Sequence, residues 1–254
     1  MAGKAQNNDY VADVQEASTS GWIAENEQRI WSYASADSPS FNATINAVDD
    51  VLSPGMRVRL MQSGVTKFFI ITYVAMSSGS TIVTLYGGTD YTLTSATISD
   101  VAFSMMKAPL WFPMSPSKWT VEVSDANDRT STTFGSVVQV NAAHVINLPI
   151  GAWYVSYQAY VGWSGVTSNM NVSLALSTST SSISSKAYQR SFQTVAAGAT
   201  TPVALSIEMN PMLIEVSTKT PYYLVGVFVA TGTNWQLQGA TYAPTYIRAV
   251  CAYL

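Results

Sequence analysis

Charged residues are scarce in this sequence: Asp, Glu, Lys and Arg make up 11% of its 254 residues. Soluble domains usually carry about 25%. The net charge is −3, and no run of Lys and Arg occurs. Binding to nucleic acid depends on clustered basic side chains that displace counterions from phosphates. The composition therefore argues against a nucleic-acid-binding protein.

Long hydrophobic runs are also missing. The longest apolar stretches, residues 68–76 and 222–230, are far shorter than the roughly 20 residues that a membrane-spanning helix requires. Residues 1–15 contain no apolar core of the kind found in signal peptides. We therefore expect no insertion into a membrane, and synthesis in a cytoplasm without export by the usual route.

Cysteine and histidine occur once each, as Cys251 and His144. One cysteine cannot form an internal disulfide, so the fold does not depend on an oxidising compartment. A zinc site needs more nitrogen and sulfur ligands than these two residues supply. A hydrolytic triad would have to use His144, but this residue alternates with apolar neighbours and is typical of a structural histidine. We expect no cofactor, no metal site and no catalytic residue here.

Carboxylates are few in the second half of the chain, where Glu208 and Glu215 are the only acidic residues after residue 130. A glycosidase needs two carboxylates that act together. The segment 125–131 holds closely spaced oxygen ligands, but it lacks the ordered pattern and the glycine of a calcium loop, so calcium binding stays open. We predict that the protein is not an enzyme.

The composition changes along the chain: residues 1–129 hold 21 of the 27 charged side chains. Proline-rich and polar segments lie at the transition and are typical of a boundary. The predicted organisation is an N-terminal arm at 1–30, a small β domain at 31–113, a linker at 114–134 and a second β domain at 135–254.

Residues 9–31 are the only segment with a helical pattern, with a thin apolar stripe at Val11, Val14 and Ala17. So narrow a stripe buries little surface. Two interpretations stay open: the arm docks onto a partner, or it packs on its own β domain.

From residue 40 onward the hydrophobic pattern has a period of two, which is typical of strands with one buried face. Residues 54–62 place apolar side chains on one face and Arg57 and Arg59 on the other. We predict a meander of four or five short strands that closes into a small β-barrel or sandwich.

Residues 84–93, TLYGGTDYTL, resemble a phosphate loop or a metal loop at first sight. A P-loop needs a lysine and a following helix, which are absent from the pattern, and Asp90 stands alone as a metal ligand. The segment therefore predicts a tight turn after a strand that ends at Tyr86, with Asp90 suited to cap it.

The second half repeats the alternation on a larger scale, with six to eight strands and no helical signal. Residues 222–230 are apolar on both faces, as expected of a central strand. The pattern predicts an antiparallel β-sandwich of the jelly-roll type, so the fold class of the whole chain is all-β.

Residues 31–113 carry an ordered series of motifs: W-x-Y-A-S-A, PG-x-R-x-x-L-x-Q, TK-aromatic-F, T-x-x-GGTDYTL and KAP-x-x-FP. This series resembles a segment that recurs in structural proteins of tailed bacteriophages and prophages. The resemblance implies a virion component of the tail-tip, baseplate, fibre or head-fibre type. Residues 1–30 match no such segment.

The second half is similar to the receptor-binding heads of phage fibres, through a strand–turn–strand pattern at 146–161 and the terminal strand at 246–254. Such heads are usually trimeric jelly rolls that bind host cell-surface saccharide. The resemblance implies a homotrimer in the virion, assembled in the bacterial cytoplasm. It also implies that the arm and the first domain contact other virion proteins.

Saccharides are held by aromatic faces and by neutral hydrogen-bonding side chains. Two segments of the second half offer both kinds of side chain, and the predicted saccharide-binding residues are Asn234, Trp235, Gln236, Tyr242 and Trp163. The alternative is that these aromatic rings are core or trimer contacts.

Apolar side chains on the expected outward faces of the strands, in a unit with little charge, favour oligomerisation. These residues are Tyr154, Tyr160, Leu224, Phe228 and Val250.

The function predicted from the sequence is that of a phage virion structural protein which binds the host surface through a trimeric C-terminal β-sandwich. One alternative is a capsid head fibre or decoration protein. Another is a glycan-depolymerising tail enzyme.

Overall fold

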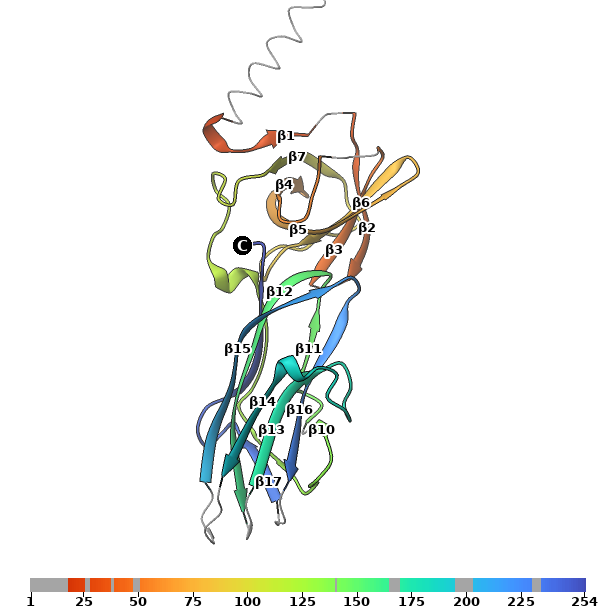
Figure 1. The fold of residues 1–254 in the computed structure, drawn as a ribbon. Coiled ribbons are helices and arrows are strands. Elements are labelled where there is room, and N and C mark those ends of the chain that lie inside the picture. The colour runs from red at the N-terminus through yellow and green to blue at the C-terminus, as the bar shows by residue number, and fades with distance from the viewer. Residues whose placement is uncertain are drawn as a thin grey trace, which may run out of the picture.

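The computed structural model describes residues 18–25, 28–37, 39–47, 51–139, 141–164, 170–194, 203–229 and 234–254. The all-β prediction is confirmed (Figure 1). Helical structure in the described chain is limited to residues 18–20 and two 3₁₀ turns, η1 (Pro116–Trp119) and η2 (Lys186–Tyr188). None of the described helices is long and apolar enough to cross a membrane.

The first domain is one antiparallel sheet in the order β1-β7-β4-β5-β6-β3-β2. Its strands are β1 (Ile23–Ala24), β2 (Trp31–Asp37), β3 (Ser40–Ile45), β4 (Arg57–Gln62), β5 (Val65–Ser77), β6 (Ser80–Tyr86) and β7 (Ile98–Ser104). The predicted alternation holds in β3, where Phe41, Ala43 and Ile45 are buried in the domain's own core. In Figure 1 this sheet curls around that core.

The second domain is a sandwich of two antiparallel sheets, one with the order β10-β16-β13-β14 plus β11 on β16, the other with β8-β18-β12-β17-β9 plus β15 on β12. Its strands are β8 (Thr120–Asp125), β9 (Asp128–Ser131), β10 (Val138–Gln139), β11 (Val145–Leu148), β12 (Gly151–Ser164), β13 (Met170–Ser177), β14 (Gln189–Thr194), β15 (Val203–Val216), β16 (Thr220–Val229), β17 (Asn234–Gln238) and β18 (Thr245–Cys251). The long strand β12 pairs with β15 along one edge and with β18 and then β17 along the other.

The segment expected to be a linker, 114–134, contains two strands of the second domain. Strand β8 pairs with β18 and strand β9 pairs with β17. The sequence concealed both strands because their side chains are largely polar and lie at the edge of the sheet, where one face and one edge meet solvent. Strands β8 and β9 therefore belong to the same sheet as β12, β17 and β18.

The described part of the N-terminal arm packs on its own domain. Strand β1 pairs with β7, with Ile23 opposite Phe103. Trp22 is buried, and its Nε1 donates a hydrogen bond to the Leu110 carbonyl at 2.8 Å. The expected helical stripe at Val11, Val14 and Ala17 lies outside the described residues.

The turn predicted at the end of β6 is present, and its two glycines allow another segment to pass close by. A Cβ on Gly87 would lie 2.0 Å from the Tyr91 carbonyl oxygen. Gly88 has a positive φ of 64°, and a Cβ there would lie 2.1 Å from the Lys118 oxygen. Asp90 forms an ion pair with Lys118. The turn therefore brings the 3₁₀ turn η1 against the end of β6.

This close approach creates an aromatic core between the domains. The Tyr86 ring lies 4.9 Å from Trp153 and 6.0 Å from Trp119, edge-on to both. Trp119 in turn stacks on Phe112 with ring centroids 5.0 Å apart. These residues belong to one hydrophobic cluster that continues into the second domain. The two domains are therefore packed together through shared apolar surface.

Arg57, which the alternation sets on the strand face opposite the apolar side chains, is fully buried at this junction. Its guanidinium donates to three backbone carbonyls: Gly55 at 2.5 Å, Tyr253 at 2.9 Å and Lys107 at 3.2 Å. It also lies over the Phe112 ring, 5.0 Å from the centroid. Burial lowers the pKa of Arg57. The contact ties the C-terminal residues to the first domain, beside which the C-terminus lies in Figure 1.

Replacing Arg57 by Met should destabilise the protein strongly, because it leaves buried carbonyls without donors. We expect a loss of about 3 kcal/mol or more in the free energy of unfolding. Urea unfolding followed by circular dichroism measures it. Arg248→Met removes an exposed ion pair with Glu122 and should cost no more than about 1 kcal/mol. Equal losses in the two variants would contradict the role of Arg57.

Candidate functional site

Two of the predicted saccharide-binding residues are core residues. Trp235 is 0% exposed, stacks on Phe228 with centroids 3.8 Å apart, and donates from Nε1 to the Thr133 carbonyl at 2.8 Å. Trp163 is 5% exposed and lies directly opposite Trp235 across the β12–β17 pairing. The prediction for these two residues is corrected: neither ring presents a face to solvent. The signal was present, since Trp163 alternates in phase with the inward residues of its strand.

The other three predicted residues lie at or near the surface. Asn234 and Gln236 are half-buried in β17. The hydroxyl of Thr130 approaches the Gln236 side-chain oxygen at 3.5 Å. Tyr242 is 54% exposed and stacks on Tyr160, with centroids 5.5 Å apart and an interplanar angle of 13°.

Polar side chains adjoin this stacked pair on the same face of the sheet. Tyr160 pairs with Ser206 across the β12–β15 ladder, and Gln158 pairs with Glu208. The Glu208 carboxylate accepts hydrogen bonds from Gln158 at 2.8 Å and from Ser206 at 2.9 Å. We call Tyr160, Tyr242, Gln158, Ser206 and Glu208 the tyrosine cluster. The structure thus brings aromatic rings and side chains that can hydrogen-bond to hydroxyl groups together around Tyr242. The sequence did not reveal this grouping.

The outward apolar residues expected from the sequence divide into two groups. Leu224 and Phe228 are fully buried, which corrects that expectation: they lie in β16, a central strand of its sheet. Tyr154 is exposed and pairs with the exposed Leu213 on β15 and with the half-buried Val250 on β18. An apolar stripe therefore crosses three neighbouring strands.

Glu208 and Glu215 cannot act together as a glycosidase pair. Both lie in strand β15, seven residues apart. A strand advances about 3.3 Å per residue, so their backbones are separated by roughly 23 Å. The two carboxylates of glycosidases lie within about 5–10 Å of each other.

His144 is buried, as expected of a structural histidine, and lies just before β11. Its Nε2 is 3.3 Å from the Asp125 carboxylate, without hydrogen-bond geometry to any described residue. Burial lowers the pKa of His144, and the nearby Asp125 charge opposes this shift in part. Hydrogen bonds from Arg129, at 2.6 and 3.2 Å, hold the pKa of Asp125 far below its usual range.

The acidic residues of the segment 125–131 are used by protein donors. Asp125 also accepts from the backbone and the side chain of Asn127. Asp128 accepts from the Ala240 and Thr241 backbone and from the Thr241 hydroxyl. These carboxylates fix the turn between β8 and β9 to the loop that follows β17.

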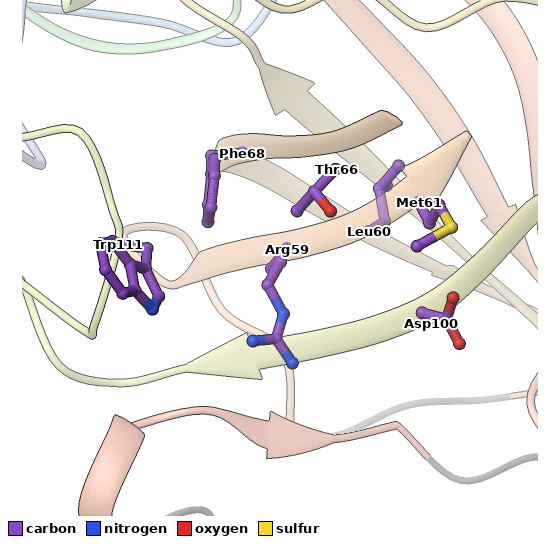
Figure 2. A pocket seen from close by; sticks show the side chains of 7 residues that line it. All are labelled: Arg59, Leu60, Met61, Thr66, Phe68, Asp100 and Trp111. Atoms are coloured by element: carbon purple, nitrogen blue, oxygen red, sulfur yellow. The ribbon is translucent and has the colours of Figure 1, made fainter. Parts of the chain in front are cut away.

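A pocket with a largely apolar lining lies on the first domain. It is a pocket of about 450 Å³ on the sheet surface formed by β4, β5 and β7, and it is lined by Arg59, Leu60, Met61, Thr66, Phe68, Asp100 and Trp111 (Figure 2). In Figure 2, Trp111 and Phe68 lie at one end and Asp100 at the other, with Arg59 between them. The pocket's size falls within the range of about 300–1,000 Å³ typical of small-molecule sites.

Two of the pocket residues hold unfavourable backbone conformations. Among the described residues, Ser63, Asp100 and Trp111 are the only non-glycine residues with positive φ, and the values for Asp100 and Trp111 are 49° and 69°. Asp100 lies where the β4–β7 register shifts, at a β-bulge. A β-bulge redirects the side chains of its strand. Strained backbone conformations persist only where the surrounding structure enforces them, and they are frequent at functional sites.

The segment around Trp111 is held firmly although the indole is 79% exposed. The Leu110 amide donates to the Ser20 carbonyl at 2.8 Å, and the Phe112 amide donates to the Pro109 carbonyl at 3.0 Å. Sequence reasoning treated this proline-rich stretch as a domain boundary and missed the site. A tryptophan between two prolines was the available signal.

No family model and no curated protein matches the chain. Among solved structures, it is similar to a protein of infectious bursal disease virus, Gx strain, with 10% identity and a TM-score of 0.30 over 89% of this chain and 64% of that one. The protein of the T13 infectious bursal disease virus particle has 13% identity and a TM-score of 0.31. That match covers 89% of this chain and 61% of the viral protein. VP2 of a subviral particle of the same virus has 9% sequence identity and a TM-score of 0.26. That match covers 95% of this chain and 81% of VP2. The chain thus spans less than two thirds of the first two proteins.

Replacing Trp235 by Ala should destabilise the folded protein. Removing a fully buried indole leaves a cavity, and we expect a loss of about 3–5 kcal/mol in the free energy of unfolding. Tyr242→Ala, at an exposed ring, should change it by no more than about 1 kcal/mol. Denaturant unfolding of both variants measures the difference. A stable Trp235→Ala protein would contradict the assignment of Trp235 to the core.

Stability should fall with pH below about 6.5 because of His144. Burial lowers the folded-state pKa of His144 from its ordinary value of 6.5, so the unfolded chain binds a proton that the folded chain rejects. The free energy of unfolding then decreases as pH falls, by up to about 1.4 kcal/mol per pH unit. Unfolding curves between pH 7.5 and 5 measure this slope. His144→Gln should flatten it, since the chain has one histidine; an unchanged slope would assign it to other groups.

Proposed function

We propose that this protein is a structural component of a tailed-bacteriophage virion, of the fibre or tail-tip type. The observation that carries the proposal is the ordered motif series over residues 31–113. Its members coincide with parts of one folded unit: strand β2, strand β4, the start of β5, the glycine turn after β6, and the segment that leads to η1.

The two domains suit different tasks in such a particle. We assign attachment to other virion proteins to residues 1–30 and the first domain, whose surface exposes Met105 and Met106. Met106 lies against Gly21, where the arm joins the domain. Methionine-rich surfaces adapt readily to protein partners. The apolar stripe of Tyr154, Leu213 and Val250 supports a homotrimer formed through the second domain.

The tyrosine cluster supports contact with a host saccharide. Strand β12 begins at Gly151, which packs against Thr72 of the first domain. Tyr160 lies nine residues further along this strand, about 30 Å away. The stacked Tyr160–Tyr242 pair offers an aromatic face, and Gln158, Ser206 and Glu208 offer partners for hydroxyl groups. The cluster is thus placed away from the attachment domain, as a host contact requires.

The position of the protein on intact particles tests the role in the virion. Gold-labelled antibodies against the chain should mark the tail tip or the fibres in electron micrographs. Labelling of the capsid would instead support a head fibre or decoration protein and would contradict the proposal.

Purified protein should bind host cells, and Tyr242→Ala should weaken this binding at least about fivefold because the aromatic face is lost. The matched control is Tyr73→Ala, which removes an exposed tyrosine from the first domain. Cell-pelleting assays with fluorescently labelled protein measure both variants. Unchanged binding by Tyr242→Ala would remove the tyrosine cluster from the host contact.

A further inference from the structure

We propose that the pocket between Trp111 and Asp100 on the first domain is a binding site for a neutral saccharide. It is a second site, on a different domain from the tyrosine cluster, and it goes beyond the function proposed above. Its lining combines the exposed Trp111 indole and the half-buried Phe68 ring with a carboxylate, a hydroxyl and a guanidinium.

Other aromatic rings surround Phe68 at the aromatic end of the pocket. Phe68 contacts three other rings, with centroid distances of 5.9 Å to Trp22, 5.7 Å to Tyr91 and 6.1 Å to Phe112. Trp111 follows Leu110, whose carbonyl accepts the hydrogen bond of the buried Trp22 indole. An exposed indole beside a phenyl ring presents π faces to the C–H groups of a sugar ring. The faces carry partial negative charge and attract the slightly positive C–H hydrogens.

The polar end of the pocket matches hydroxyl groups. Among the described residues none donates a hydrogen bond to the Asp100 carboxylate, which is exposed at the bulge of β7. A carboxylate accepts several hydrogen bonds and a threonine hydroxyl both donates and accepts, so Asp100 and Thr66 complement the hydroxyls of a sugar. The Arg59 guanidinium adds donors and lies over the Trp22 ring, 5.3 Å from its centroid.

The charges in the pocket favour a neutral ligand. Asp100 and Arg59 both line it, so an anionic ligand would lie beside the carboxylate and a cationic one beside the guanidinium. Hydroxyl groups interact well with both. A purely apolar ligand would cover the Asp100 carboxylate without offering it a hydrogen-bond donor, which costs free energy on binding.

The strained backbone at Asp100 and Trp111 fits a preorganised site. Each residue holds a positive φ that its side chain disfavours, and each contributes the side chain at one end of the same pocket. Strain of this kind costs about 1–3 kcal/mol per residue and persists where the surrounding structure enforces it. Backbone held in place at both ends of the pocket reduces the entropy lost when a rigid sugar ring binds.

The test uses the full chain and a panel of neutral oligosaccharides built from hexoses and N-acetylhexosamines, with sialylated and sulfated glycans and a basic peptide as comparison probes. Calorimetry or a glycan array should detect binding to neutral members of the panel. Trp111→Ala should weaken that binding by about tenfold or more, and Trp111→Phe should restore part of it. Asp100→Asn tolerates the same positive φ and should weaken binding about fivefold through the lost charge.

Two control variants separate this site from other effects. Leu110→Ala changes the neighbouring exposed side chain of the same segment and should leave binding unchanged. Tyr242→Ala alters the second domain and should also leave binding at this pocket unchanged. Thermal unfolding should show that all the variants are folded.

Three results would overturn the inference: binding of no neutral glycan, binding that Trp111→Ala leaves intact, or preference for the charged probes. Loss of binding in Tyr242→Ala but not in Trp111→Ala would leave the host contact proposed for the second domain standing and remove this pocket. The two proposals therefore fail separately.

Discussion

The fold depends on one buried cation. Arg57 lies between the domains and donates to carbonyls of the loop before β4, of the segment after β7 and of Tyr253, which follows β18. A guanidinium carries five donors in a rigid fork, so this one side chain can satisfy three buried carbonyls at once. The aromatic rings of Tyr86, Trp119 and Trp153 then close around the same junction. These contacts join β4 and β6 of the first domain to β12 and the residues after β18 in the second domain. They therefore fix the position of one domain relative to the other.

This junction explains sequence features that have no binding or catalytic chemistry of their own. Gly87 and Gly88 exist at the end of β6 because the backbone of Lys118 and the carbonyl of Tyr91 occupy the space where a Cβ would lie. The proline-rich stretch 108–117 turns the chain from the first sheet toward η1, which delivers Trp119 to the junction. While doing so it also leaves Trp111 exposed over the sheet, where a pocket forms.

Much of the secondary structure followed from the sequence, and less of the site did. Alternation of apolar and polar side chains revealed the strands with one buried face, such as β3, and the doubly buried β16. It missed β8 and β9, whose polar side chains lie at sheet edges. It also gave no sign that Arg57 is buried, since a charged residue opposite an apolar strand face is usually exposed. The residue types around Trp235 suggested a binding loop. An aromatic residue in such a segment is as often part of the hydrophobic core as of a binding site. Which rings reach solvent depends on strand pairing between residues distant in sequence, such as Trp163 and Trp235.

The sequence by itself determined the all-β class, the glycine turn, the burial of the single histidine, and a motif series that resembles phage structural proteins. These follow from local periodicity, turn chemistry and residue type, which act over a few positions. Only the tertiary structure decided that the domains share a core, that Tyr242 stacks on Tyr160 beside Glu208, and that Asp100 and Trp111 meet at one pocket. Each of these depends on side chains brought together from separate strands, and hydrophobic periodicity carries no information about which strands become neighbours.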